Sequence, residues 1–297
     1  MDSGGWRGYP IADWEGIHME EIVNCPLCGS KEFGPWGSEN GYQCGRCSGC
    51  RLLYVNPRPC QDSIDKGVQL GVHLDENLNL NVVGRRAAWK VSKSRKLLQE
   101  NFPDFQTRTN PVRWLDVGAG FGEFVEALTD YLPVGSTCEG IEPMAPKAEF
   151  ARNRGLGIRQ AYLSEVTEKY DVVSIIDIFS HVPNFHSFLQ EIKDVLRPGG
   201  EVFIKTGNGA DLESRNEIPG PLTLPDHLVF AGESHLRRFL QMGGFDVVSL
   251  QACRVDGLVY SARNLVKWLL RKPVHLGVPY TSRLRTMYIR ARLRGGV

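Results

Sequence analysis

The sequence lacks the features that mark several large classes of protein. No apolar run approaches the roughly 18 residues that a membrane-spanning helix needs. An excess of one charge is also missing, because 35 Lys and Arg residues against 34 Asp and Glu residues leave a net charge of +1. With 42% apolar and 23% charged residues, the composition is that of an ordinary globular chain, and it excludes a disordered or fibrous protein.

The N-terminus also lacks the apolar stretch of a secretory signal. Residues 1–22 are rich in glycine, tryptophan and charge without any periodicity, so we expect a flexible arm there. We accordingly expect a cytoplasmic protein. The 297 residues are enough for one large domain or two smaller ones.

What the chain does contain is a cluster of cysteines near its start. Five of its eight cysteines fall within residues 25–50, namely Cys25, Cys28, Cys44, Cys47 and Cys50. The first two form one Cys-x-x-Cys pair, and the other three form two overlapping pairs. Two such pairs about 15–20 residues apart have the spacing of a four-thiolate zinc site. The spacing alone leaves two choices for the second pair, Cys44 with Cys47 or Cys47 with Cys50.

From about residue 111 the pattern changes to strands alternating with helices. The expected strands cover 112–118, 136–143, 171–179, 201–207 and 245–254, and the expected helices cover 122–132, 145–155, 182–196 and 234–242. Such alternation predicts a doubly wound α/β fold, with a mainly parallel sheet and helices on both faces. We interpret residues 23–59 as a zinc-ribbon-like segment and residues 60–110 as a helical lead-in.

A glycine loop follows the first of these strands. Gly118, Gly120 and Gly122 lie between Asp116 and the next helix, where a ligand can approach the main chain and the first amides of the helix. The spacing is GxGxG rather than the GxGxxG of dinucleotide sites, and Glu123 at the helix start would repel a pyrophosphate. Glu142 ends the second strand, where an acid can accept hydrogen bonds from ribose hydroxyls. Together these residues predict a nucleoside site with no demand for pyrophosphate.

Four ordered motifs carry a family resemblance. The segments LDVGAGFG, GIEP, YDVVSIIDIFSHVPN and LRPGG resemble the motifs of class I S-adenosylmethionine-dependent methyltransferases, over roughly residues 111–254. The resemblance implies a Rossmann-like domain over 111–297 with seven strands, the last of them antiparallel. We expect that last strand at about 286–293, and a helical insertion before it at about 258–270.

The resemblance also implies which residues bind the cofactor, S-adenosylmethionine. The set is Asp116, Gly118, Ala119, Gly120, Phe121, Gly122, Glu142, Pro143, Leu163, Asp177, Ile178 and Phe179. Within it, the loop passes under the cofactor, Glu142 takes the ribose, and the last three residues flank the methyl group. Tyr162 and Leu163 stand where the family contacts adenine.

The cysteine segment resembles the N-terminal segment of a subgroup of bacterial-type methyltransferases. CPLCGS and CSGCRLLYVNPRP match its pattern, except that Arg51 stands where the pattern has glycine. This likeness favours Cys25, Cys28, Cys47 and Cys50 as ligands of a zinc ion and leaves Cys44 as a spare thiol. We expect the zinc to be structural, because a closed site of four sulfurs leaves no position for water or substrate.

Two histidines are candidates for catalysis. His181 follows the fourth strand in DIFSHVPN, and His227 lies in LPDHLVF, where this fold commonly builds its acceptor pocket. A base assists methyl transfer to a hydroxyl, and histidine is the usual candidate at neutral pH. The alternative is that His181 starts a helix or packs, and that His227 anchors a loop.

These features predict an enzyme that transfers a methyl group to a small-molecule, sugar or glycan acceptor, on oxygen. The subgroup that it resembles is often associated with such acceptors. One alternative is an RNA base methyltransferase, although no Asn-Pro-Pro-Tyr-type motif follows the fourth strand. Another is a non-catalytic module that uses the zinc segment for protein contacts.

The C-terminal segment is strongly basic. Residues 257–297 contain nine basic residues and no acidic one, so the rest of the chain carries the opposing negative charge. Four interpretations are open: docking of an anionic acceptor, contact with an anionic membrane surface, binding of RNA, or a packed helix with solvated arginines.

Overall fold

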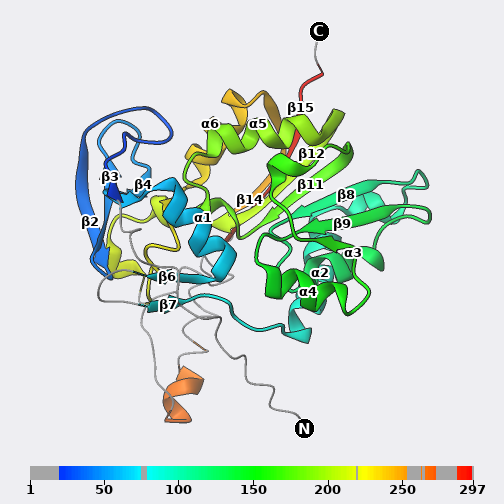
Figure 1. Cartoon of the computed structure of the whole chain (residues 1–297), viewed down its shortest axis with the longest axis horizontal. Helices are drawn as coiled ribbons and strands as arrows, with labels where there is room; N and C mark the ends of the chain where they lie inside the picture. The colour runs from blue at the N-terminus through cyan, green and yellow to red at the C-terminus, as the bar shows by residue number, and fades with distance from the viewer. Residues whose placement is uncertain are drawn as a thin grey trace.

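The structure is a computed structural model that describes residues 20–74, 79–218, 220–252, 262, 265–271 and 286–295. A large sheet covered by helices forms one part of the molecule, and a smaller cysteine-containing lobe lies beside it (Figure 1). The predicted arm at 1–22 lies almost entirely outside the described residues.

The large sheet has seven strands in the order β10-β9-β8-β11-β12-β15-β14 among the described residues. In chain order these are β8 (Arg113–Val117), β9 (Thr137–Ile141), β10 (Ile158–Arg159), β11 (Tyr170–Ile176), β12 (Leu196–Gly207), β14 (Phe245–Ala252) and β15 (Thr286–Leu293). The neighbours from β10 to β12 pair in parallel, whereas β15 runs antiparallel to both β12 and β14. The predicted mainly parallel, Rossmann-like sheet is therefore confirmed.

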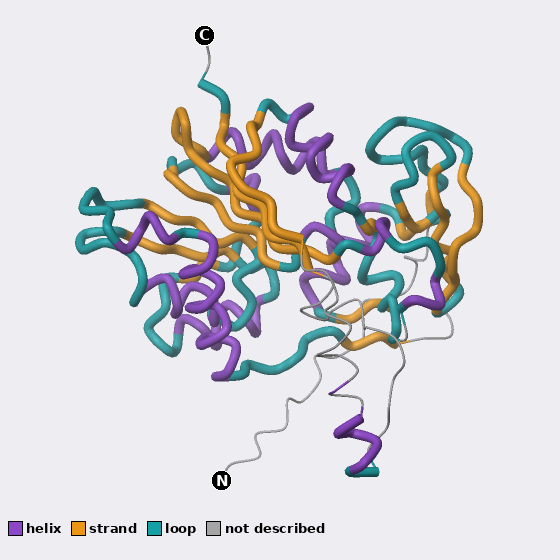
Figure 2. The backbone as a smooth tube through the Cα atoms, turned by 180° about the vertical axis from the view of Figure 1, so that it is seen from behind, coloured by secondary structure: helices purple, strands orange, loops and turns teal. Residues whose placement is uncertain are grey.

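Helices cover both faces of this sheet (Figure 2). They are α2 (Ala88–Asn101), α3 (Glu123–Thr129) and α4 (Ala145–Arg152), and then α5 (Phe185–Val195) and α6 (Glu233–Met242). Side chains alternate across a strand, so Trp114 packs with the α2 and α3 residues while Leu115 joins the α5 and α6 cluster. Burial on both faces explains why the central strands read as continuous apolar runs.

The smaller part, which we call the cysteine lobe, is a four-stranded sheet in the order β13-β4-β3-β2. Its strands are β2 (Phe33–Glu39), β3 (Tyr42–Cys47), β4 (Leu53–Val55) and β13 (Val229–Phe230). A further short pair joins β1 (Glu20–Glu21) to β5 (Arg58–Pro59). Because β13 belongs to the connection between β12 and α6, the lobe is completed by a strand from the methyltransferase-like part of the chain.

Residues 60–110 contain a hairpin as well as helices. After α1 (Gln61–Leu70), the chain turns at Gly71, whose φ of 66° is left-handed, into the hairpin β6 (Val72–Leu74) and β7 (Asn79–Asn81). Then α2 follows, and a 3-10 turn, η1 (Pro103–Gln106), leads into β8.

The last described part of the chain is β15 and a short helical stretch before it. Residues 265–269 are helical, and the rest of the predicted insertion at 258–270 lies outside the described residues apart from residues 262 and 270. In the part of the chain that the structure describes, no helix is long and apolar enough to cross a membrane.

A buried arginine, Arg290, links β15 to the C-terminal end of α2. Arg290 is 8% exposed, and its guanidinium donates to Glu201 on β12 at 2.8 and 3.0 Å. It also donates to the Asn101 carbonyl at 2.8 Å and to the Asp104 carboxylate at 2.8 Å, and it lies 4.1 Å from the centre of the Phe102 ring. Every donor direction thus has a partner, as a buried charge requires.

We expect Arg290→Met to lower the free energy of unfolding by about 3 kcal/mol, because the buried Glu201 carboxylate would keep only its ion pair with Arg292. Arg292 also pairs with Glu201 but is 58% exposed, so Arg292→Met serves as the matched control and should cost less than about 1 kcal/mol. Urea denaturation of the two variants measures both values. Equal losses would contradict the assignment of the stabilising role to the buried guanidinium.

Candidate functional site

The glycine loop after β8 exposes main chain to a cavity. The amides of Gly118 and Ala119 both donate to the Ile141 carbonyl at 2.9 Å, which fixes the loop against β9. Gly118 has a φ of +70°, and a Cβ there would meet the Ile178 side chain at 2.2 Å. Gly120 has a φ of +57° and open space where its Cβ would stand, so its backbone is accessible to a ligand.

Two buried acids flank this loop. Asp116 is 2% exposed and accepts a hydrogen bond from the Ser174 hydroxyl at 2.5 Å. Burial, together with the charge of Glu142, raises the pKa of Asp116 to about 7. The Glu142 carboxylate accepts from the Gly120 amide at 2.7 Å and from the Met144 amide at 3.0 Å. The acid at the end of β9 is therefore tied directly to the glycine loop.

The cavity has a volume of about 1180 Å³, and most of the predicted site residues line it. Those that line it are Asp116, Gly118, Ala119, Gly120, Glu142, Pro143, Tyr162, Leu163, Asp177, Ile178, His181 and His227. They come from the carboxyl ends of β8, β9 and β11, and from the loops after β10 and β12. Parallel strands present these ends at one edge of a sheet, which explains how distant segments meet.

Three predicted cofactor residues do not line this cavity. Gly122 has a φ of +84° and starts α3, with the Leu156 side chain against the position of a Cβ. The Phe121 ring packs edge-on against Phe150, with ring centres 5.4 Å apart. Phe179 is fully buried and packs on the α5 and α6 aromatics, so it is a core residue in this structure.

His181, Asp226 and His227 form a cluster on the cavity wall. His181 lies in η3 (Phe179–His181), and its Nδ1 donates to the Asp226 carbonyl at 2.8 Å and lies 3.2 Å from the Asp226 carboxylate. The rings of His181 and His227 have centroids 4.8 Å apart. The Nδ1 of His227 donates to the Leu222 carbonyl at 2.6 Å. A neutral ring that donates through Nδ1 carries its basic lone pair on Nε2.

The surroundings drive the pKa values of the two histidines apart. Burial, reinforced by the charge of His181, lowers the pKa of His227 to about 4. Burial also lowers the pKa of His181, but the charge and hydrogen bonds of Asp226 outweigh that effect and leave the pKa above its usual value. Asp226 is itself buried, yet its histidine partners hold its pKa well below the usual range. At neutral pH His227 is therefore the neutral imidazole of the pair.

Three residues of this region are not among the predicted ones. Asp226 stands next to His227 in the sequence, but nothing there predicts that its carboxylate meets His181. His73 on β6 places Nε2 at 3.0 Å from the same carboxylate, from a segment with no readable pattern. Lys205, buried on β12, pairs with the exposed carboxylate of Asp177. A lysine inside the apolar run EVFIKTG was the one sequence signal for it.

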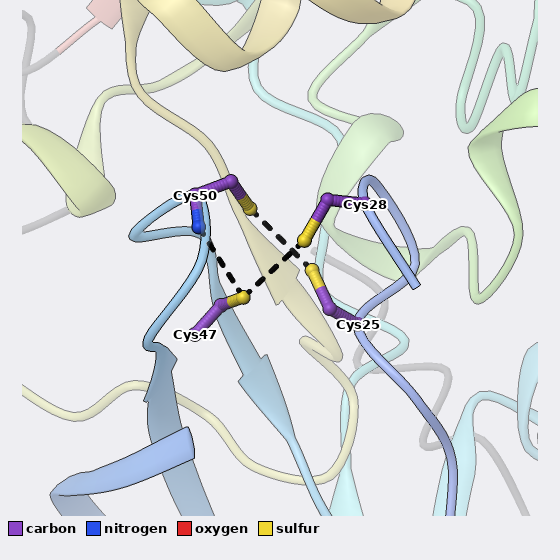
Figure 3. Close-up of side chains that lie close together, drawn as sticks. All are labelled: Cys25, Cys28, Cys47 and Cys50. Atoms are coloured by element: carbon purple, nitrogen blue, oxygen red, sulfur yellow. Dashed lines mark hydrogen bonds between the residues drawn. The ribbon is translucent and has the colours of Figure 1, made fainter. Parts of the chain in front are cut away.

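The cysteine lobe gathers four thiols at a second site (Figure 3). The sulfurs of Cys25, Cys28, Cys47 and Cys50 all lie within 4.8 Å of one another. Cys25 lies 3.5 Å from Cys50, and Cys28 lies 3.5 Å from Cys47, sulfur to sulfur. Cys44 is fully buried in a separate apolar cluster with Leu53 and Phe230. Of the two choices left open by the spacing, the structure brings together the one with Cys50.

The four-thiol cluster has the donor chemistry of a tetrahedral metal site. A zinc–sulfur distance of about 2.3 Å corresponds to sulfurs about 3.8 Å apart, close to the separations here. The hydrogen bond with Cys50 lowers the pKa of Cys25 to about 5, whereas burial raises the pKa of Cys28, and the hydrogen bond with Cys25 raises the pKa of Cys50. Deprotonation of all four thiols would therefore depend on the charge of a bound cation. The Tyr54 hydroxyl is buried with no hydrogen-bond partner among the described residues, and burial together with the charges of the nearby cysteines raises its pKa to about 12. The residues present therefore fit a cation bound by four sulfurs.

Comparison with known families agrees with this architecture. Residues 85–250, more than half of the chain, match the family described as "Methyltransferase domain". The chain belongs to this methyltransferase domain family. The matched region runs from just before α2 to β14, so it includes the glycine loop, Glu142 and the His181 cluster, and it excludes the four thiols.

Among curated proteins, this methyltransferase domain is similar to ubiquinone biosynthesis O-methyltransferases. The one from Escherichia coli O139:H28 is 27% identical over 161 residues, which cover 50% of this chain and 65% of that protein. The one from Shigella boydii serotype 18 has the same identity and coverage. The chain thus spans just under two thirds of the length of these relatives.

Solved structures with a similar fold include two S-adenosylmethionine-dependent methyltransferases. The protein from Archaeoglobus fulgidus is 17% identical with a TM-score of 0.47, covering 68% of this chain and 94% of that chain. The protein from Mesorhizobium loti is 18% identical with a TM-score of 0.46, covering 64% of this chain and 96% of that chain.

The basic C-terminal segment is only partly described. Its apolar side chains Leu265, Val266, Trp268, Leu269 and Leu270 are all more than half exposed. Arg290, in contrast, is buried in the fold. Contact of this segment with an anionic acceptor, a membrane surface or RNA stays a prediction, as does the cytoplasmic location.

The raised pKa of Asp116 makes cofactor binding depend on pH. A cationic ligand favours the ionised carboxylate, so affinity should rise as pH passes upward through about 7. We expect S-adenosylmethionine to bind on the order of tenfold more tightly at pH 7.5 than at pH 5.5. Titration calorimetry at both pH values measures this, and Asp116→Asn should abolish the difference. Equal affinities of the unchanged protein at the two pH values would refute the role of Asp116.

Proposed function

We propose that this methyltransferase domain transfers the methyl group of S-adenosylmethionine to a hydroxyl oxygen of a small-molecule or sugar acceptor. The observation that carries the proposal is the position of His227, which lies beside His181 on the wall of the same cavity as the glycine loop and donates through Nδ1 to the Leu222 carbonyl, leaving Nε2 to accept a proton. Membership of the methyltransferase domain family supports S-adenosylmethionine as the methyl donor. The His227 imidazole supports an acceptor group, such as a hydroxyl, that loses a proton in the reaction.

The proposed reaction is an in-line displacement. The acceptor oxygen bonds to the methyl carbon, the carbon–sulfur bond breaks with its electron pair going to sulfur, and the hydroxyl proton passes to Nε2 of His227. The sulfonium supplies an activated methyl group, so the chain's main task is alignment, which is worth up to roughly 7–11 kcal/mol. Asp226 stabilises a charge on His181 and fixes its ring. The ion pair of buried Lys205 with the exposed carboxylate of Asp177 also lines the cavity, at the ends of β12 and β11.

The relatives support oxygen as the methylated atom. Two of them are named as O-methyltransferases of ubiquinone biosynthesis, which is methylation of a small molecule on oxygen. The 27% identity over half of this chain supports the type of reaction, and we propose the acceptor only as a chemical class. The acceptor class that we propose is therefore a small molecule with a hydroxyl group.

Removal of the proposed base should slow the chemical step. We expect His227→Ala to lower kcat by about 10²–10⁴-fold while the affinity for S-adenosylmethionine stays within about threefold. His181→Ala should have a smaller effect in the same direction. His186→Ala is the matched control, because His186 lies on α5 against Phe239 and does not line the cavity.

Methyl-labelled S-adenosylmethionine, offered with phenols, sugars, nucleotide-linked sugars and RNA, provides the assay for these variants. Label recovered as an O-methyl ether agrees with the proposal. Label in RNA bases would instead identify the chain as an RNA methyltransferase. If both histidine variants keep turnover within about tenfold of the unchanged protein, neither residue is the base.

For the cysteine lobe we propose a structural zinc ion bound by Cys25, Cys28, Cys47 and Cys50. Four sulfurs at this spacing complete a tetrahedron and leave no open coordination position. The lobe's own apolar core is small, so the metal would supply part of its folding free energy.

The two candidate ligand sets share Cys47 and differ in Cys44 and Cys50, so these two cysteines separate them. Cys50→Ala should remove about one zinc ion per chain and unfold the lobe, because a three-sulfur site binds zinc much less tightly. Cys44→Ala is the matched control and should keep the metal, since its thiol lies outside the cluster. Metal analysis by mass spectrometry together with thermal denaturation checks both. Retention of zinc in Cys50→Ala would rule out the proposed ligand set.

A further inference from the structure

The turn between β2 and β3 reaches the loop that contains His227. We call Glu39, Asn40 and Gly41 the hairpin tip. Asn40 and Gly41 have φ values of 54° and 82°, the left-handed pair that a tight two-residue hairpin requires. This geometry projects the side chains of the tip beyond the end of the cysteine lobe's sheet, against residues 222–224.

Three hydrogen bonds join the hairpin tip to that loop. The two oxygens of the Glu39 carboxylate accept from the amides of Leu222 and Thr223, each at 2.7 Å. The Asn40 amide donates to the Leu224 carbonyl at 2.7 Å. Bonds to a charged acceptor are among the stronger ones in proteins, and here one carboxylate binds two consecutive backbone amides.

The same loop residues orient the imidazole of His227. Its Nδ1 donates to the Leu222 carbonyl at 2.6 Å, and its backbone amide donates to the Thr223 carbonyl at 3.0 Å. The Leu222 carbonyl therefore accepts a hydrogen bond from His227, while the Leu222 amide donates one to Glu39. The position of the His227 ring therefore depends on the position of the hairpin tip, through the backbone of Leu222 and Thr223.

The loop needs such a support because its backbone is strained. Thr223 has a φ of +63°, a left-handed conformation that a β-branched residue rarely adopts. Glu39 is mostly buried, with a side chain 17% exposed, and the nearest cation, Arg215, lies 3.6 Å away. Arg215 in turn donates to the carbonyls of Ile218 and Gly220. The donors around the Glu39 carboxylate, namely the amides of Leu222 and Thr223 and the guanidinium of Arg215, thus all belong to the segment before His227.

We propose that Glu39 and Asn40 are positioning residues that hold the His227 imidazole in its Nδ1–H tautomer, with Nε2 toward the acceptor. This inference rests on the proposed function, in which His227 is the base. It gives the cysteine lobe a task in the proposed reaction through the tip of one hairpin, although the residues of the tip do not themselves line the cavity.

The test reads the ring of His227 directly and needs no acceptor. Full-length protein labelled with ¹⁵N in the histidine rings is titrated from about pH 3 to pH 8 by NMR, so that the range includes the midpoint of His227, and His227→Ala identifies the His227 signals. The groups that face this ring are His181 and Asp177 from the end of β11, and Asp226 from its own loop, with His73 of β6 behind Asp226. None of them is altered in the variants below.

Glu39→Gln removes the charge and can accept only one of the two amides. We expect its His227 signals to become a mixture of the two neutral tautomers. Water should also reach the freed loop, so the midpoint of the His227 titration should rise by about one pH unit toward its ordinary value. Asn40→Gly keeps the left-handed turn, loses only the side chain, and should give the same change to a smaller extent. It also provides the test if Glu39→Gln does not fold.

Glu213→Gln is the matched control. Glu213 also pairs with a residue of the lobe, Arg51, but both side chains are more than half exposed, and within the described residues the Glu213 side chain has no recorded hydrogen bond to residues 222–227. Its His227 signals should match those of the unchanged protein. The proposal is overturned if Glu39→Gln and Asn40→Gly leave the tautomer and midpoint of His227 unchanged. Failure of methyl transfer to depend on His227 is a separate result, obtained from the label assay, and overturns the base assignment instead.

Discussion

The pairing of two short strands, β4 and β13, is the contact on which the arrangement of the site depends. Val229 and Phe230 add a fourth strand to the cysteine lobe, opposite Tyr54 and Leu53. Asp226 and His227 precede β13 with only Leu228 between, and Cys50 precedes β4 with only Arg51 and Leu52 between. Because the ladder fixes both segments at once, the lobe and the cavity wall that carries His227 are one structural unit.

The charges around the cavity are divided in a way that suits sulfonium chemistry. Asp116 and Glu142 lie at the glycine loop, whereas the histidine pair and Lys205 lie on the wall after β11 and β12. In the proposed reaction a cationic cofactor becomes a neutral thioether. Buried carboxylates therefore favour the reactant over the product in binding, which assists release after each turnover.

Much of the fold could be predicted from sequence because its determinants are local. Burial on both faces makes the central strands continuous apolar runs, and the GxGxG loop after the first strand predicts a nucleoside site. The cysteine spacing predicted a cluster, but choosing Cys50 over Cys44 required a resemblance, since both pairs have the same spacing. What could not be predicted depends on contacts between distant segments. His73 comes from a polar hairpin, and Glu39 acts at residues 222–223; the Asn40-Gly41 turn signal marks the hairpin but not what lies against it.

The position of β15 has a consequence for how the chain is made. It lies between β12 and β14 and follows both in sequence, so within the described residues β14 has no other strand beside it in the sheet. During synthesis, β14 leaves the ribosome more than 30 residues before β15, the strand with which it pairs. The Arg290 network, which spans β12, β15 and the end of α2, closes last. A nascent chain thus exposes the edges of β12 and β14 until residues 286–293 emerge, an interval in which chaperone binding to these edges would protect against aggregation.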